Sequence, residues 1–216
     1  MAGDKPSAEL KDRVKQISPG VYRVGDITVD AKLGVAVFPA EVNQLVGLIE
    51  YALVTEIGKV HESFLSTKAR PSDIHAAMLL LGAKSPGAVS IEVGWKVDDK
   101  WVRKPMLDFI GQYPLETASE QNDKVTVKSF DIKSHDWKWT GSRIQNGKTA
   151  AVLSGSVLSL QPVIDALAMI VPMVDTSRFG SHVWPKRAPK IGQAVQVFIR
   201  LKKPAPTEPG ATKTPI

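Results

Sequence analysis

Short runs of β-forming residues, separated by turn residues, occupy most of the chain and are the feature that most constrains its fold. Asn146 and Gly147 stand between two of these runs. Both central residues of a tight hairpin turn need positive φ, which Asn-Gly supplies readily. We therefore predict a hairpin at residues 146–147. The predicted strands cover residues 22–29, 34–38, 47–55, 61–65, 89–97, 125–132, 137–144, 149–160 and 194–201.

Helical patterns are fewer than strand patterns. Residues 71–81 begin with Pro71 in the first turn and stop at Gly82, which predicts a helix. Residues 105–110 predict a short helical turn, and residues 162–169 predict a second helix. The expected fold class is therefore α+β, in which a strand-rich mixed or antiparallel sheet is covered by two or three short helices.

The length of 216 residues suits one domain with a proper core. Residues 1–20 are polar, so we expect a flexible N-terminal segment. Residues 203–216 contain four prolines among small and polar residues and are expected to be disordered. The single domain is expected to span residues 21–202. The longest apolar run, residues 76–81, is far shorter than the roughly 18 residues that a membrane-spanning helix needs.

Cysteine is absent from the sequence. This excludes disulfides, thiolate zinc sites, Fe–S clusters and cysteine nucleophiles together. The first residues lack the apolar core of a secretory signal. We therefore expect either a cytoplasmic protein or a mature form from which a signal has been removed.

The formal net charge of +6 is concentrated at the end of the chain. After Asp175 there are eight basic residues and one acid, Glu208. Basic segments can bind nucleic acid because neutralised phosphates release counterions. Stacking aromatics are missing from this segment apart from Trp184, so weak electrostatic nucleic-acid binding is a minor alternative.

A polar, titratable segment at residues 58–63 (GKVHES) interrupts the apolar strands, and His75 follows His61 in the predicted helix. If that helix folds back over the strand, two imidazoles and the carboxylate of Glu62 or Glu50 could hold a divalent metal or move protons. Otherwise the histidines tie strand to helix and Lys59 forms a solvated pair with Glu62. The candidate cluster comprises Lys59, His61, Glu62, Ser63, His75 and Glu50, with His61, His75 and Glu62 as the candidate metal ligands.

Aromatic side chains supply a second set of candidates. Trp137 and Trp139 lie two residues apart on one strand, and we expect them to pack in the core because tryptophan buries so much area. Trp184 lies in a basic loop after Arg178 and His182, and loops on a rigid scaffold often carry sites. Trp184, His182 and Arg178 are therefore the candidate surface-binding residues.

Within the segment 38–84, a set of residues forms a recognisable pattern: Phe38, Pro39, Ala40, Glu50, Gly58, Lys59, His61, Glu62, Ser63, His75 and the run 78–82. On these residues the segment resembles the YdjY-type domain of bacterial proteins. The resemblance continues through residues 139–142 (WTGS), 155–159 and 189–199, so that it spans about residues 21–201. It implies an exported protein of the cell envelope, periplasmic or secreted in its mature form, and it assigns no catalytic residue. A loop reduced here to Val174, Asp175 and Thr176 departs from the pattern.

These observations favour a noncatalytic binding or interaction module of the bacterial envelope, whose partner is an unknown ligand or envelope protein. The GKVHES segment, His75 and the Trp184 loop would form its surface. The alternative is a metal-dependent hydrolase or related enzyme, with His61 and His75 as ligands and Glu62 as ligand or general base. No cofactor is predicted, apart from the divalent metal that this alternative needs.

Overall fold

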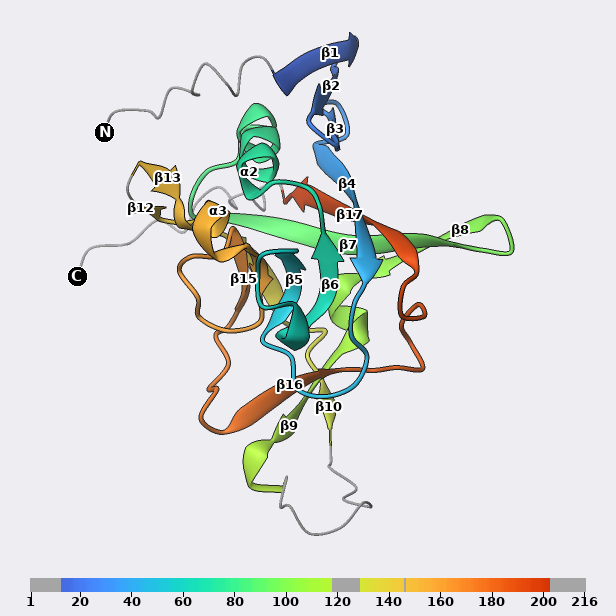
Figure 1. The fold of residues 1–216 in the computed structure, drawn as a ribbon, viewed down its shortest axis with the longest axis vertical. Coiled ribbons are helices and arrows are strands. Elements are labelled where there is room, and N and C mark those ends of the chain that lie inside the picture. Colours follow the sequence, from blue (N-terminus) through green and yellow to red (C-terminus); the bar gives the residue numbers. More distant parts are fainter. Residues whose placement is uncertain (1–12, 118–128, 146, 203–216) are drawn as a thin grey trace, which may run out of the picture.

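A closed barrel of eight strands forms the centre of the molecule (Figure 1). The computed structural model describes residues 13–117, 129–145 and 147–202. Neighbouring strands pair around the ring, and the last strand pairs back with the first. In order, the ring contains β4 (Val35–Val42), β17 (Ala194–Leu201), β7 (Gly87–Val97), β11 (Asp136–Trp139), β15 (Ala168–Val171), β14 (Ser156–Ser159), β5 (Tyr51–Thr55) and β6 (Ser63–Thr67).

This closure corrects the expected fold class. We expected an α+β fold with a sheet covered by two or three helices, and that prediction was wrong. Among the described residues, the α-helices are α2 (Pro71–Leu80) and α3 (Ala150–Ser154). A sheet that closes on itself buries its apolar face inside the ring, so it needs no layer of covering helices.

Alternating side chains fill the barrel interior. Val197 of β17 lies opposite Phe38 of β4 on one side and Val93 of β7 on the other. All three side chains are fully buried. Burial of such a side chain contributes about 1.5–3 kcal/mol, so the alternation in these strands is a main source of stability. Trp137 and Trp139 are also buried, which confirms their expected place in the core.

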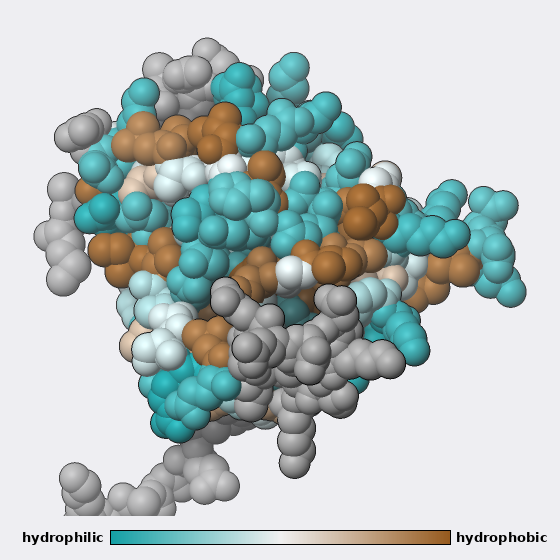
Figure 2. All heavy atoms as spheres, turned by 60° about the horizontal axis from the view of Figure 1, so that its bottom comes forward, coloured by the Kyte–Doolittle hydropathy of each residue, from teal (hydrophilic) through white to brown (hydrophobic). Residues whose placement is uncertain are grey.

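The remaining strands extend or flank the barrel. The β7–β8 hairpin projects from it in Figure 1, and Figure 2 shows mostly hydrophilic atoms at the tip of this projection. A separate three-stranded sheet lies at the opposite end of the molecule from α2 (Figure 1). These elements are β1 (Val14–Ser18), β2 (Val21–Val24), β3 (Ile27–Asp30) and β8 (Lys100–Pro105) in the barrel sheet; β9 (Ile110–Pro114), β10 (Phe130–Asp131) and β16 (Phe179–Val183) in the separate sheet; and the pair β12 (Ile144–Gln145) and β13 (Lys148–Thr149).

Helix α2 confirms the prediction for residues 71–81. It begins at Pro71, and Gly82 just beyond it has a φ of 84°. Ile74, Ala77 and Met78 are fully buried and face the core. The helix contacts β2, β3 and β4, so one face of it closes over this side of the barrel sheet.

The turn predictions are also confirmed. Ile144 pairs with Thr149 and Gln145 with Lys148, as a hairpin with its turn at residues 146–147 requires. Gly147 has a φ of 73°, whereas Asn146 lies outside the described residues. The turn expected at residues 105–110 is the 3-10 helix η2 (Met106–Phe109). Two further 3-10 turns are η1 (Val60–Glu62) and η3 (Leu115–Thr117).

Three local predictions were wrong in whole or in part. The helix expected at residues 162–169 is replaced by a loop and by β15, which is held between β11 and β14. The strand expected over residues 149–160 is interrupted by α3. In the third case, the strand expected at residues 61–65 begins only at Ser63, because residues 60–62 form η1.

Part of the expected organisation lies outside the described residues. This holds for residues 1–12, for the tail 203–216 and for residues 125–128 of one expected strand. Residues 14–18, within the segment expected to be flexible, form β1 and pair with β2.

Across the described ranges, every helix is too short or too polar to cross a membrane.

Candidate functional site

The GKVHES segment forms a surface ion network. Lys59 Nζ donates to Glu50 Oε2 and to Glu62 Oε2, each at 2.9 Å. The hydrogen bonds to Glu50 and Glu62 raise the pKa of Lys59 above its ordinary value. The hydrogen bond from Lys59 is also the main reason that the pKa of Glu62 is lowered. Ser63 is buried and its hydroxyl donates to the Leu65 carbonyl at 2.7 Å. Lys59 and its two carboxylates therefore form a largely satisfied pair network at the surface.

His61 and His75 line different cavities. His61 lies at a shallow hollow of about 330 Å³, with its side chain 74% exposed and its Nε2 3.6 Å from Glu62 Oε1. His75 lies on α2, where its ring centroid is 6.2 Å from that of Trp139. The five residues of β6 and the following link separate the two histidines along the chain.

A shared metal site is therefore not assembled from these residues. In the described part of the chain, no group of three or more His, Cys, Asp or Glu side chains is gathered in a way that could hold a metal ion. The metal-dependent alternative stays a prediction, which elemental analysis of protein purified without chelators would test.

Side chains of the Trp184 loop contact one another and His182 of β16, in the three-stranded sheet. The rings of His182 and Trp184 meet edge to face at 4.6 Å, and the Arg187 guanidinium lies 4.6 Å from the Trp184 ring centroid. His182 Nδ1 is 2.9 Å from the Val183 carbonyl oxygen. The Arg187 guanidinium also donates a hydrogen bond to the Asp131 carboxylate. This hydrogen bond is the main reason that the pKa of Asp131 is lowered.

Arg178, the third surface candidate, lies directly before β16. Its guanidinium is 5.7 Å from the ring centroid of Phe179. The backbone of β16 carries these residues, pairing with β9 from Phe179 to Val183. His182 thus lies in β16, with Arg178 directly before the strand and Trp184 directly after it, and none of the three joins the GKVHES network.

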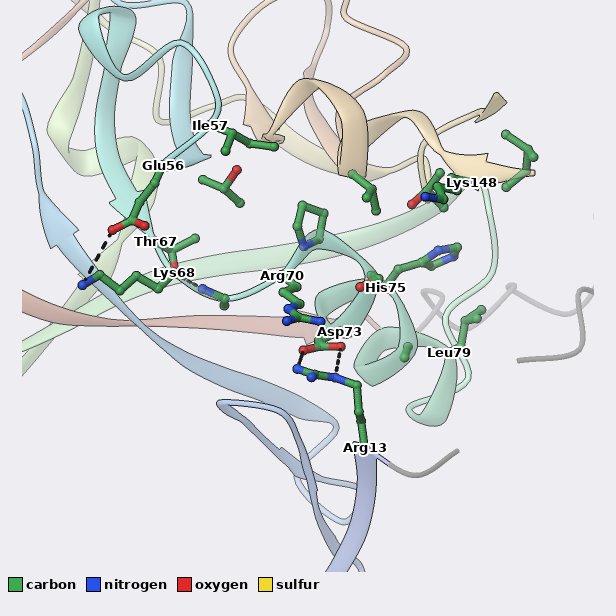
Figure 3. A pocket seen from close by; sticks show the side chains of 18 of the residues that line it. Arg13, Glu56, Ile57, Thr67, Lys68, Arg70, Asp73, His75, Leu79 and Lys148 are labelled. Atoms are coloured by element: carbon green, nitrogen blue, oxygen red, sulfur yellow. Dashed lines mark hydrogen bonds and ion pairs between the residues drawn. The ribbon is translucent and has the colours of Figure 1, made fainter. Parts of the chain in front are cut away.

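A larger pocket lies beside α2, and it was not among the sites proposed from the sequence. It encloses about 680 Å³, within the range of small-ligand sites in proteins. β5 and β6 are parallel, so their carboxyl ends open at the same end of the barrel, where this pocket lies. Figure 3 shows Ile57 and Lys148 on one wall and the α2 residues on the other. The lining residues are Arg13, Thr55, Glu56, Ile57, residues 67–73, His75, Ala76, Leu79, Ile144, Gly147, Lys148, Thr149 and Val152.

Two ion pairs account for part of the charge in the pocket. Arg13 Nε donates to Asp73 Oδ1 at 3.0 Å, and Lys68 Nζ is 3.7 Å from Glu56 Oε1. Both pairs are drawn in Figure 3. Among the described residues, both acids that line the pocket, Glu56 and Asp73, are thereby matched by a cation.

Arg70 and Lys148 are the cations that remain. Among the residues that the structure describes, neither side chain has an ion-pair or hydrogen-bond partner. His75 lines the same pocket and is the one candidate from the sequence that does so. The pocket therefore carries an excess of positive charge that its own acids do not neutralise.

The sequence contained a weak signal for this site. Arg70 precedes Pro71 at the predicted start of the helix, and Lys148 follows the predicted hairpin turn. Each position could be placed on its element, but nothing in the sequence pairs the two elements. Only the closed barrel brings the ends of β5 and β6, the start of α2 and the β12–β13 hairpin around one cavity.

Comparisons with protein-family models, with curated proteins and with solved structures find no match to this chain. The resemblance to YdjY-type domains and the envelope location that it implies stay predictions.

Proposed function

We propose that this chain is a noncatalytic binding module that holds a small anionic ligand in the pocket beside α2. The observation that carries the proposal is the pair of unmatched cations, Arg70 and Lys148, on a cavity of about 680 Å³. Guanidinium and ammonium groups are the usual partners of carboxylates and phosphates. A bound anion would neutralise the charge that the pocket leaves unmatched.

The position of the pocket also favours binding. Small-molecule sites are concave and occur frequently at the mouths of β-barrels. The interior of this barrel is filled by side chains such as Val197 and Phe38, so its end offers the space that its centre does not. His75 adds a group that can donate or accept a hydrogen bond beside the two cations.

The location of the module is a separate part of the proposal. We propose a periplasmic or secreted mature form, supported by the YdjY-type resemblance of residues 38–84. A cytoplasmic location is the other expectation. The residues that line the pocket are the same in either location.

The first prediction concerns charge selectivity. Octanoate should bind more tightly than octyltrimethylammonium, which has a chain of the same length and the opposite charge. Lys148→Ala and Arg70→Ala should each weaken octanoate binding by roughly tenfold, because a hydrogen bond to a charged group contributes about 1.5–3 kcal/mol. Isothermal titration calorimetry measures both effects.

The matched control for this prediction is Lys186→Ala. Lys186 is exposed in the Trp184 loop and does not line the pocket, so octanoate affinity should be unchanged. Equal affinity for the anion and the cation, or equal losses in Lys186→Ala and Lys148→Ala, would contradict the proposed function.

A further inference from the structure

We infer that the ligand of this pocket is an amphiphilic anion, with a carboxylate or phosphate head group on an apolar chain. The inference rests on the proposed function and names the class of ligand. It adds a requirement for an apolar body to the requirement for negative charge.

Apolar side chains surround the same cavity as the unmatched cations. Ile57, Leu79 and Ile144 all line it, although their exposed fractions are 70%, 46% and 55%. They come from three separate places: the loop after β5, the end of α2, and β12. Scattered exposed apolar residues need no explanation, but three that converge on one cavity give it an apolar rim that a ligand could cover.

The apolar lining continues inward from this rim. Val152 of α3 is half-buried and Ala76 of α2 is buried, and both line the pocket. A ligand chain in contact with these residues would remove their surfaces from water together with its own. Each buried methylene then contributes to affinity as it does in a protein core.

The head group is assigned to the cationic residues. Figure 3 shows Lys148 and Ile57 on one wall of the pocket and Arg70, His75 and Leu79 on the α2 side. Polar and apolar groups thus occur on both walls. An elongated ligand lying between the walls can satisfy both kinds of group, which a fully ionic or fully apolar ligand cannot.

The test is a chain-length series. Butanoate, octanoate and dodecanoate, each below its micelle concentration, should bind with affinity that rises by about two- to fourfold per methylene. Octan-1-ol should bind at least tenfold more weakly than octanoate because it lacks the charge. Octyl phosphate compared with octanoate shows which head group the site prefers. Calorimetry gives the dissociation constants.

Variants of the apolar rim separate this inference from a general effect of chain length. Affinity should rise from butanoate to dodecanoate, and Leu79→Gln and Ile144→Gln should each reduce this rise in affinity several-fold. The matched control is Ile191→Gln, since Ile191 is 62% exposed but lies beside His61 and not on this pocket. Circular dichroism and thermal unfolding check that all three variants fold.

The outcomes distinguish the inference from the proposed function. If Lys148→Ala weakens anion binding but affinity is independent of chain length, the proposed function stands and the inference is wrong. The inference is also wrong if Leu79→Gln, Ile144→Gln and Ile191→Gln behave alike. If octan-1-ol binds as tightly as octanoate, or no anion binds, the proposed function itself fails.

Discussion

Arg13 and Asp73 form an ion pair, and both residues line the pocket beside α2. Arg70 lines the same pocket without such a partner among the described residues. Asp73 is 2% exposed. Arg13, which directly precedes β1, donates a hydrogen bond from its Nε to Asp73 Oδ1 at 3.0 Å. Gly25 makes room for the pair: a Cβ at Gly25 would lie 2.7 Å from Arg13 Nη2, and its φ is +57°. The pair therefore ties the N-terminal strands to α2.

Our residue-scale prediction is that Arg13→Met lowers the free energy of unfolding by about 1–3 kcal/mol. The variant leaves a buried carboxylate without its cation, and the cost is discounted because the Arg13 side chain is 32% exposed. Urea denaturation at neutral pH measures the change. Lys15→Met, at an exposed position of β1, should cost little. Equal costs in the two variants would show that the ion pair has no special role.

The GKVHES residues illustrate what residue types alone can predict. A pair between Lys59 and Glu62 follows from their spacing and opposite charge, and the structure has it. The second partner, Glu50, lies nine positions before Lys59, at a distance in the chain where spacing gives no guide. Polar composition therefore drew attention to a network in which Lys59 is paired with two carboxylates, while the cations without a partner among the described residues lie elsewhere.

At the scale of elements, α3 and β15 show why local pattern failed in one part of the chain. Residues 162–169 carry helical spacing, but Ala168–Val171 pair with β11 and with β14. The barrel needs a strand at this position, and pairing on both edges outweighs a weak local preference. α3 ends at Ser154, and Gly155, which caps it, has a φ of 71°.

Gly155 provides the prediction at this scale. Gly155→Ala should lower the free energy of unfolding by more than about 2 kcal/mol. The backbone of Gly155 is in the left-handed region, and an added Cβ would lie 2.6 Å from the Gly58 backbone nitrogen. Gly147→Ala is the matched control. Its φ of 73° is similar but nothing lies within 4 Å of the added Cβ, so only about 1–2 kcal/mol of backbone strain is expected. Urea denaturation compares the two variants, and a cost for Gly155→Ala no larger than the control would refute the close-approach argument.

At the scale of the whole molecule, ring closure predicts how stability is distributed. β17 is paired along both edges, with β4 and with β7, whereas β8 is paired with β7 alone. Opening β17 requires the barrel itself to open, while β8 can separate from the edge of β7.

We expect backbone amides of β17 and β4 to exchange with solvent only through global unfolding, and those of β8 to exchange through local opening. Hydrogen exchange followed by mass spectrometry measures this at the level of peptides. Protection of β8 peptides equal to that of β17 peptides would contradict the prediction.

The sequence by itself determined the local features of this protein. Alternating apolar residues specified strands such as β7 and β17, Pro71 and Gly82 bounded α2, and Gly147 marked a hairpin. These features depend on neighbouring residues, whose periodicity and backbone preferences are readable in one dimension.

Only the tertiary structure decided the barrel and the pocket. Alternation determines which side chains of a strand face inward, but it does not determine which strand lies beside it. The pairing of β6 with β4 closes the ring, and the pairing of β17 with β4 joins segments from the two ends of the chain. Arg70 and Lys148 face one cavity because of those pairings, which depend on the packing of the whole core.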